Sequence, residues 1–82
     1  MKKIVIGVWV PAIGRKHDFI VPNTLGIAKI IDLMCMTLKD EYGVCFKPQQ
    51  VMLMNQEDQT VLNRDCSMKQ LGVQNGSQFI LM

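Results

Sequence analysis

The sequence predicts an α+β fold in which one helix covers one face of a mixed sheet of four to five strands. Two observations lead to this prediction. Apolar and β-branched runs follow the order of two strands, a helix and three further short strands, and only one stretch has helical periodicity. At 82 residues the chain forms a single domain, residues 1–82, and one sheet with one helix is about the largest core it can support.

The first two strands follow from the composition of residues 4–21. Residues 4–10 are rich in β-branched side chains, and their even positions are uniformly aliphatic, whereas Val5, Gly7 and Trp9 form a mixed set. Because side chains alternate across a strand, the even set is expected to face the core and the odd set to face outward. Residues 11–15 contain Pro and Gly and predict a hairpin loop, after which residues 17–21 return antiparallel with Phe19 and Val21 inward.

The helix is predicted from an apolar stripe that recurs at three and four residues and consists of Ile27, Ile30, Ile31, Met34 and Leu38. Asn23 or Thr24 is expected to cap its start, with Gly26 in the first turn. Gly43 is expected to end it.

The C-terminal half alternates short apolar runs with polar loops. Residues 51–54 predict a third strand, 60–62 a brief fourth strand, and 78–82 the last strand, which follows the turn at residues 75–76. Residues 67–72 predict one helical or 3₁₀ turn that places Leu71 under the sheet.

Composition and charge exclude several classes of function. The net charge is +2 and the basic residues are scattered, so no nucleic-acid partner is expected. The three cysteines are an odd number without close spacing, which predicts reduced, mostly buried thiols and no metal or other cofactor. Lys29 and Asp32 interrupt the most apolar helical stretch, and no signal peptide is evident, so direct membrane insertion is not expected either.

In order and spacing, this chain resembles ubiquitin-like β-grasp proteins over nearly its whole length. The segments that carry the resemblance are the N-terminal hairpin, the helix, Lys47-Pro48-Gln49-Gln50 before an apolar strand, and Ser67–Val73 with Asn75-Gly76-Ser77 before the last strand. It is closer still to the small bacterial proteins of the YukD/EsaB type. That resemblance implies a cytoplasmic accessory or regulatory component of a type VII secretion system. Its expected partner is a protein, such as a membrane subunit or ATPase of the system, and related domains are fused to a membrane subunit in actinobacteria.

The end of the sequence bears on the choice between a binding module and a carrier. Conjugation tags and sulfur carriers need a flexible Gly-Gly tail, whereas no glycine follows Gly76 here. We therefore expect a non-enzymatic protein-binding module. A sulfur carrier or modifier, which a longer reading frame would revive, and a β-grasp adaptor unrelated to secretion remain the alternatives.

The outward face of the sheet is the predicted binding surface. Alternation places Ile80 and Met82 outward on the last strand, Val5 and Trp9 outward on the first, and Leu53, with Val51, outward on the third. In ubiquitin the equivalent face is the main partner-binding surface, and the resemblance assigns Leu53 and Ile80 to it. The expected protein-binding residues are Leu53, Ile80, Met82, Trp9 and Val5.

A second apolar surface is predicted on the outer face of the helix. Leu25, Leu33 and Met36 fall opposite the core stripe at about 100° per residue. Self-association into a homo-oligomer or docking to a larger assembly is one interpretation. A tolerated, partly apolar exposed face or a cover from residues 43–50 is the other.

No catalytic site is predicted. His17 and Asp18 are adjacent on a strand and therefore point to opposite faces, so they do not converge on one site. Ser67 is expected to cap its own turn.

Overall fold

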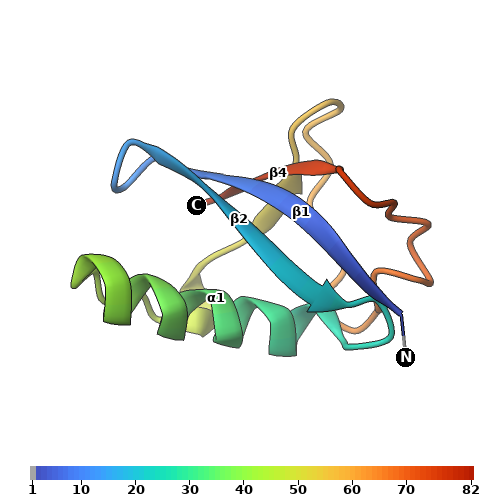
Figure 1. The fold of residues 1–82 in the computed structure, drawn as a ribbon, viewed down its shortest axis with the longest axis horizontal. Coiled ribbons are helices and arrows are strands. Elements are labelled where there is room, and N and C mark those ends of the chain that lie inside the picture. Colours follow the sequence, from blue (N-terminus) through green and yellow to red (C-terminus); the bar gives the residue numbers. More distant parts are fainter. Residues whose placement is uncertain (1) are drawn as a thin grey trace.

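The structure, a computed structural model, describes residues 2–82 and consists of a four-stranded sheet with one long helix beneath it (Figure 1). The elements are β1 (Lys3–Val10), β2 (Arg15–Pro22), α1 (Ile27–Tyr42), the 3₁₀ helix η1 (Pro48–Gln50), β3 (Leu53–Asn55) and β4 (Gln78–Leu81).

The strand order in the sheet is β2-β1-β4-β3. β1 pairs with β2 antiparallel and with β4 parallel, and β3 pairs with β4 antiparallel, so the sheet is mixed. The two terminal segments of the chain therefore lie side by side in the centre of the sheet, while β2 and β3 form its edges. The predicted α+β class, with one helix on one face of a mixed sheet, is confirmed.

The N-terminal hairpin follows the predicted alternation. All four even positions of β1 are at most 3% exposed, and Phe19 and Val21 on β2 are 8% and 4% exposed. The hairpin turn uses Gly14 at a φ of +61°, a left-handed conformation in which a side chain would be strained.

The helix buries the predicted stripe of Ile27, Ile30, Ile31, Met34 and Leu38, each at most 1% exposed, and adds Cys35. Its start differs from the prediction, because neither Asn23 nor Thr24 caps it. Gly26, not a residue of the first turn, is the N-cap, with extended backbone and no side-chain cap bond. A single strand-type bridge from Gly26 to Ser67 and the bond from the Ile27 amide to the Cys66 carbonyl (2.8 Å) hold this end instead.

Two predicted elements of the C-terminal half are reduced to isolated contacts. The strand expected at residues 60–62 is a single bridge between Val61 and Met54. Residues 67–72 form a turn, not a helix, and Met68 is fully buried there, whereas Leu71 is 38% exposed. The prediction that Leu71 lies under the sheet is therefore wrong: the bridge at Ser67 fixes the turn so that the following residue enters the core.

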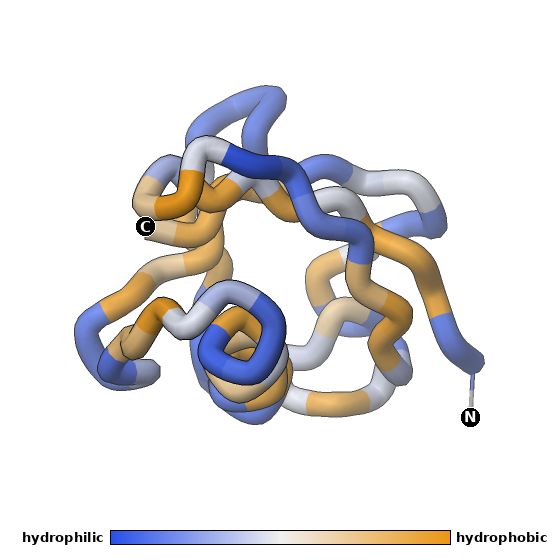
Figure 2. The backbone as a smooth tube through the Cα atoms, turned by 60° about the vertical axis from the view of Figure 1, so that its left-hand side comes forward, coloured by the Kyte–Doolittle hydropathy of each residue, from blue (hydrophilic) through white to orange (hydrophobic). Residues whose placement is uncertain are grey.

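The core lies between the sheet and α1 and contains no buried polar or charged residue among the described residues. In Figure 2 the loop that follows β3 projects as a hydrophilic segment, while the strand before it is hydrophobic. Arg64 stabilises the segment that connects α1 to β3, because its guanidinium donates hydrogen bonds to the carbonyls of Val51 (3.0 Å) and Pro48 (2.9 Å). Over residues 2–82, no helix has the length and apolar character that a membrane crossing requires.

Candidate functional site

The outer face of the sheet is the side that α1 leaves uncovered. On β1, Val5 and Trp9 point to this side and are each 40% exposed. Gly7 lies between them and is buried, since a Cβ at this position would collide with the side chains of Gln78 and Lys16. Two polar side chains thus cover the middle of the outer face at β1.

Strand register brings three apolar side chains into one row across this face. Trp9 pairs with Ile80, and Ile80 pairs with Met54 on its other side. The bridge from Met54 to Val61, which is 49% exposed, extends the row beyond the sheet edge. A row of paired residues on one face is in side-chain contact range, so these residues form one continuous apolar surface.

The row has a second layer at the carboxyl end of β4. Met52 and Met82 exchange two backbone hydrogen bonds of 2.7 and 3.0 Å, and their side chains are 46% and 50% exposed. Since their neighbours Leu53 and Leu81 are buried, alternation places both methionines on the outer face. We refer to the whole set as the sheet-face patch. It consists of Trp9, Met52, Met54, Val61, Ile80 and Met82.

The prediction that Leu53 lies outward is wrong. Leu53 is 1% exposed and pairs with the equally buried Leu81, and Val51 is 7% exposed. Residues 51–54 are apolar without alternation, so the sequence left the phase of this strand undetermined, and pairing with β4 set it. The outward residues that the prediction missed are Met52 and Met54.

Val5 points outward as predicted but lies apart from the sheet-face patch. It pairs with Ile20 of β2, which is 68% exposed. The row between this pair and Trp9 consists of Asp18, Gly7 and Gln78, and is polar. The structure therefore groups Trp9, Ile80 and Met82 and separates Val5 from them.

A shallow hollow of about 720 Å³ borders the patch at Trp9. Its other lining residues are polar or small and come from β2, the end of β3 with the loop after it, and the turn that leads into β4: Lys16, Asn55, Gln56, Glu57, Gly76, Ser77 and Gln78. An apolar centre with a polar border is the usual composition of a protein interface.

On the helix, the structure separates the three residues predicted for self-association. Leu33 and Met36 are exposed at 46% and 62%. Leu25 precedes the helix and packs against the core, so its predicted place on the outer face is wrong. The helical angle used for Leu25 does not apply, because the helix starts two residues later.

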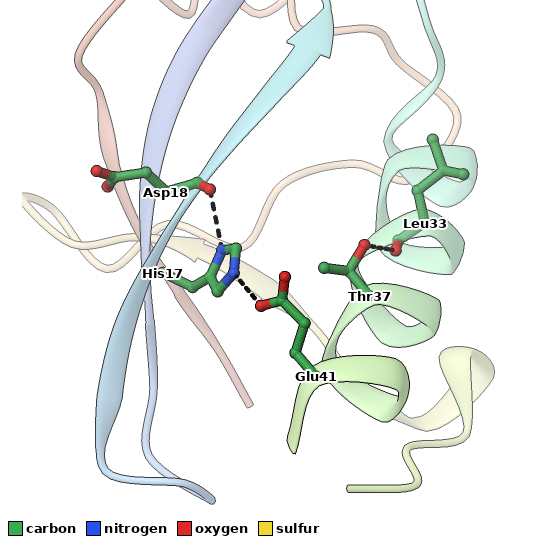
Figure 3. Close-up of polar contacts among 5 residues, drawn as sticks. All are labelled: His17, Asp18, Leu33, Thr37 and Glu41. Atoms are coloured by element: carbon green, nitrogen blue, oxygen red, sulfur yellow. Dashed lines mark hydrogen bonds and ion pairs between the residues drawn. The ribbon is translucent and has the colours of Figure 1, made fainter. Parts of the chain in front are cut away.

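His17 and Asp18 point to opposite faces of β2, as predicted. His17 lies on the helix side, with Nε2 2.8 Å from Glu41 Oε2 and Nδ1 2.9 Å from the Asp18 carbonyl oxygen, and Asp18 points away (Figure 3). The His17 ring also packs 4.6 Å from the Phe19 ring. These contacts connect β2 to the end of α1.

The cysteines are free but are not all buried. Cys35 is buried, Cys66 is half-buried, and Cys45 is exposed. The prediction that most of the thiols are buried is therefore wrong. Burial and, to a smaller extent, the Asp32 carboxylate raise the pKa of the Cys35 thiol. Ser67 caps its own turn as predicted, since its Oγ accepts a hydrogen bond of 3.2 Å from the Gln70 amide.

Comparison with known proteins gives matches in structure alone. No family model and no curated protein matches the sequence. Among solved structures, the chain is similar to the EccD5 ubiquitin-like domain from Mycobacterium xenopi, with 19% identity, a TM-score of 0.78, and coverage of 100% of this chain and 94% of that one.

Two further solved structures are similar to this chain. Ubiquitin from Caldiarchaeum subterraneum has 18% identity and a TM-score of 0.77, covering 98% of this chain and 91% of the other. The ubiquitin-like domain of Arabidopsis thaliana protein At2g32350 has 14% identity and a TM-score of 0.78, covering 100% and 78%. Identities this low establish the fold and no more. Strand order, the single helix and these similarities together show that the chain has the ubiquitin-like β-grasp fold.

Proposed function

We propose that this protein is a non-enzymatic ubiquitin-like module that binds a partner protein through the sheet-face patch. The observation that carries the proposal is the register Trp9–Ile80–Met54, which joins one exposed and two half-buried apolar side chains from three strands on the side that α1 leaves open. Burying such a row removes apolar surface from water without moving the backbone.

The composition of the patch suits docking. Three of its six residues are methionines, whose flexible and polarisable side chains adapt to an apolar partner surface. Trp9 supplies a large rigid anchor of the type enriched among the residues that dominate binding energies.

We further propose that the partner belongs to a type VII-like secretion system in which this protein serves as a cytoplasmic accessory or regulatory component. The similarity to the EccD5 ubiquitin-like domain supports this assignment, and so does the resemblance to YukD/EsaB-type proteins. The expected partner is the cytosolic part of a membrane subunit or ATPase of that system.

The test is isothermal titration calorimetry, in which this protein is titrated with the purified cytosolic part of the membrane subunit or of the ATPase from the same organism. Ile80→Asp is expected to weaken binding by about thirtyfold or more, the effect of losing a central interface residue. The matched control is Ile20→Asp, which introduces the same charge at an exposed isoleucine of the same face outside the patch. Urea unfolding of both variants checks that the fold is intact.

Three results would overturn parts of the proposal. If Ile80→Asp binds as well as the unmodified protein, the patch is not the interface. If Ile20→Asp weakens binding equally, the interface extends beyond the sheet-face patch, across the polar row of Asp18, Gly7 and Gln78. If neither secretion component binds, the assignment to secretion fails.

A further inference from the structure

The outer side of α1 carries a narrow row of four residues with a distinctive order. Lys29, Leu33, Met36 and Asp40 recur at spacings of four, three and four residues, which places them within a sector of about 60°. All four are exposed, with Leu33 at 46% and Met36 at 62%. We call this row the helix strip.

The helix strip lies opposite the residues that α1 buries, so it faces away from the sheet. In the two views of Figures 1 and 2, no segment of residues 2–82 runs across that side of the helix. The alternative cover by residues 43–50 is therefore not present. Those residues lie beside the strip, where Cys45, Phe46 and Pro48 form a groove with Met36.

The two charges of the strip do not serve the helix itself. A lysine near a helix start and an aspartate near its end both oppose the helix dipole, which favours the reverse arrangement. The first turn has no acidic residue, and neither Lys29 nor Asp40 forms an ion pair with another residue of 2–82. Their positions are thus explained neither by helix stability nor by a partner within the chain.

The helix strip is complementary to a second copy of itself that runs in the opposite direction. Lys29 and Asp40 are equidistant from a point between Met34 and Cys35, and Leu33 and Met36 are equidistant from the same point. An antiparallel second copy placed on a twofold axis at that point sets each Lys29 opposite an Asp40 and each Leu33 opposite a Met36. A parallel copy would set equal charges against each other.

We propose that the helix strip is a self-association surface on which a second copy of this chain packs antiparallel, helix against helix. A twofold axis is the symmetry that lets one surface serve both copies. The strip spans only about three turns, so the dimer is weak and forms as concentration rises from micromolar to millimolar. The inference is independent of the sheet-face patch, which lies on the opposite side of the molecule.

Sedimentation velocity over that concentration range, at low ionic strength to limit screening, tests the proposal. Lys29→Glu and Asp40→Lys, each alone, are expected to weaken the dimer about tenfold, because both ion pairs become like-charge contacts. The variant that carries both Lys29→Glu and Asp40→Lys restores the wild-type dissociation constant, because each glutamate then lies opposite a lysine. An equimolar mixture of the two single variants also restores association, as a heterodimer.

The matched control for Lys29→Glu is Lys69→Glu, which makes the same change of net charge at an exposed position outside α1 and leaves the dimer unchanged. Leu33→Asp removes the apolar centre and abolishes association, with circular dichroism confirming that α1 is intact. A wild-type protein that stays monomeric throughout the range would sink the proposal. A charge-exchanged variant that associates no better than the single variants would refute the antiparallel pairing.

Discussion

The sheet face and the helix face both expose apolar side chains, but they are organised in different ways. The sheet-face patch draws its residues from separate parts of the chain, and strand pairing assembles them: Trp9 from β1, Met54 from β3 and Ile80 from β4. The helix strip comes from one continuous element and is organised by helical spacing alone. The first depends on register, and the second depends only on the helix being formed.

The largest effect is expected at β3, where adjacent residues belong to opposite faces. Leu53→Ala removes a side chain that is 1% exposed, and we expect a loss of about 2–5 kcal/mol of stability from lost burial and the cavity left behind. Met54→Ala, the matched control on the outer face, is expected to lose less than about 1 kcal/mol. Urea unfolding measures both. Equal losses would contradict the assignment of Leu53 to the core and Met54 to the outer face.

The second prediction uses Trp9, the single tryptophan, to separate the two surfaces. Docking on the sheet-face patch withdraws the exposed indole from water and shifts its fluorescence to shorter wavelength. Self-association through the helix strip leaves the emission unchanged, because α1 lies on the other side of the sheet. Leu33→Asp should abolish the dimer and keep the partner-induced shift. A shift that accompanies self-association would show that the two surfaces are not independent.

The third prediction concerns the end of α1 that carries Asp40. Gly43 caps this end in a left-handed conformation with a φ of 67°, and its amide donates to the Lys39 carbonyl at 2.9 Å. No atom lies within 4 Å of a Cβ built there, so Gly43→Ala tests conformation without a clash, and we expect a loss of about 1 kcal/mol. Gly43→Asn, which tolerates this conformation better, should lose less in thermal unfolding. An alanine variant as stable as the parent would contradict the cap.

The smallest effect is expected at the contact between β2 and the end of α1. The Glu41 side chain is 53% exposed, so its bond to His17 is partly screened by water. Glu41→Ala is expected to lower stability by less than about 1 kcal/mol. Glu57→Ala, at an exposed residue outside any ion pair among residues 2–82, serves as the control in chemical unfolding. A loss of several kcal/mol would show that this contact, rather than core packing, holds the helix end in place.

The fold class, the hairpin and the helix all follow from local patterns in the amino-acid sequence. Each rests on a local pattern: an aliphatic even set beside a mixed odd set at residues 4–10, spacings of three and four at residues 27–38, and a glycine at the helix end. The observed burial confirms these assignments. Within a single strand or helix, the positions that are apolar in the sequence are the positions that the structure buries, so a local pattern is enough to predict them.

Long-range contacts, and not local patterns, set which of residues 51–54 face outward and which apolar residues meet on the sheet face. Four consecutive apolar residues satisfy either phase, and only pairing of Leu53 with Leu81 chose the one that turns Met52 and Met54 outward. Long-range contacts also replaced local signals at the helix start, where a bridge from Gly26 to Ser67 took the place of a side-chain cap. Such choices depend on partners distant in sequence, and a local pattern carries no information about which partner will be there.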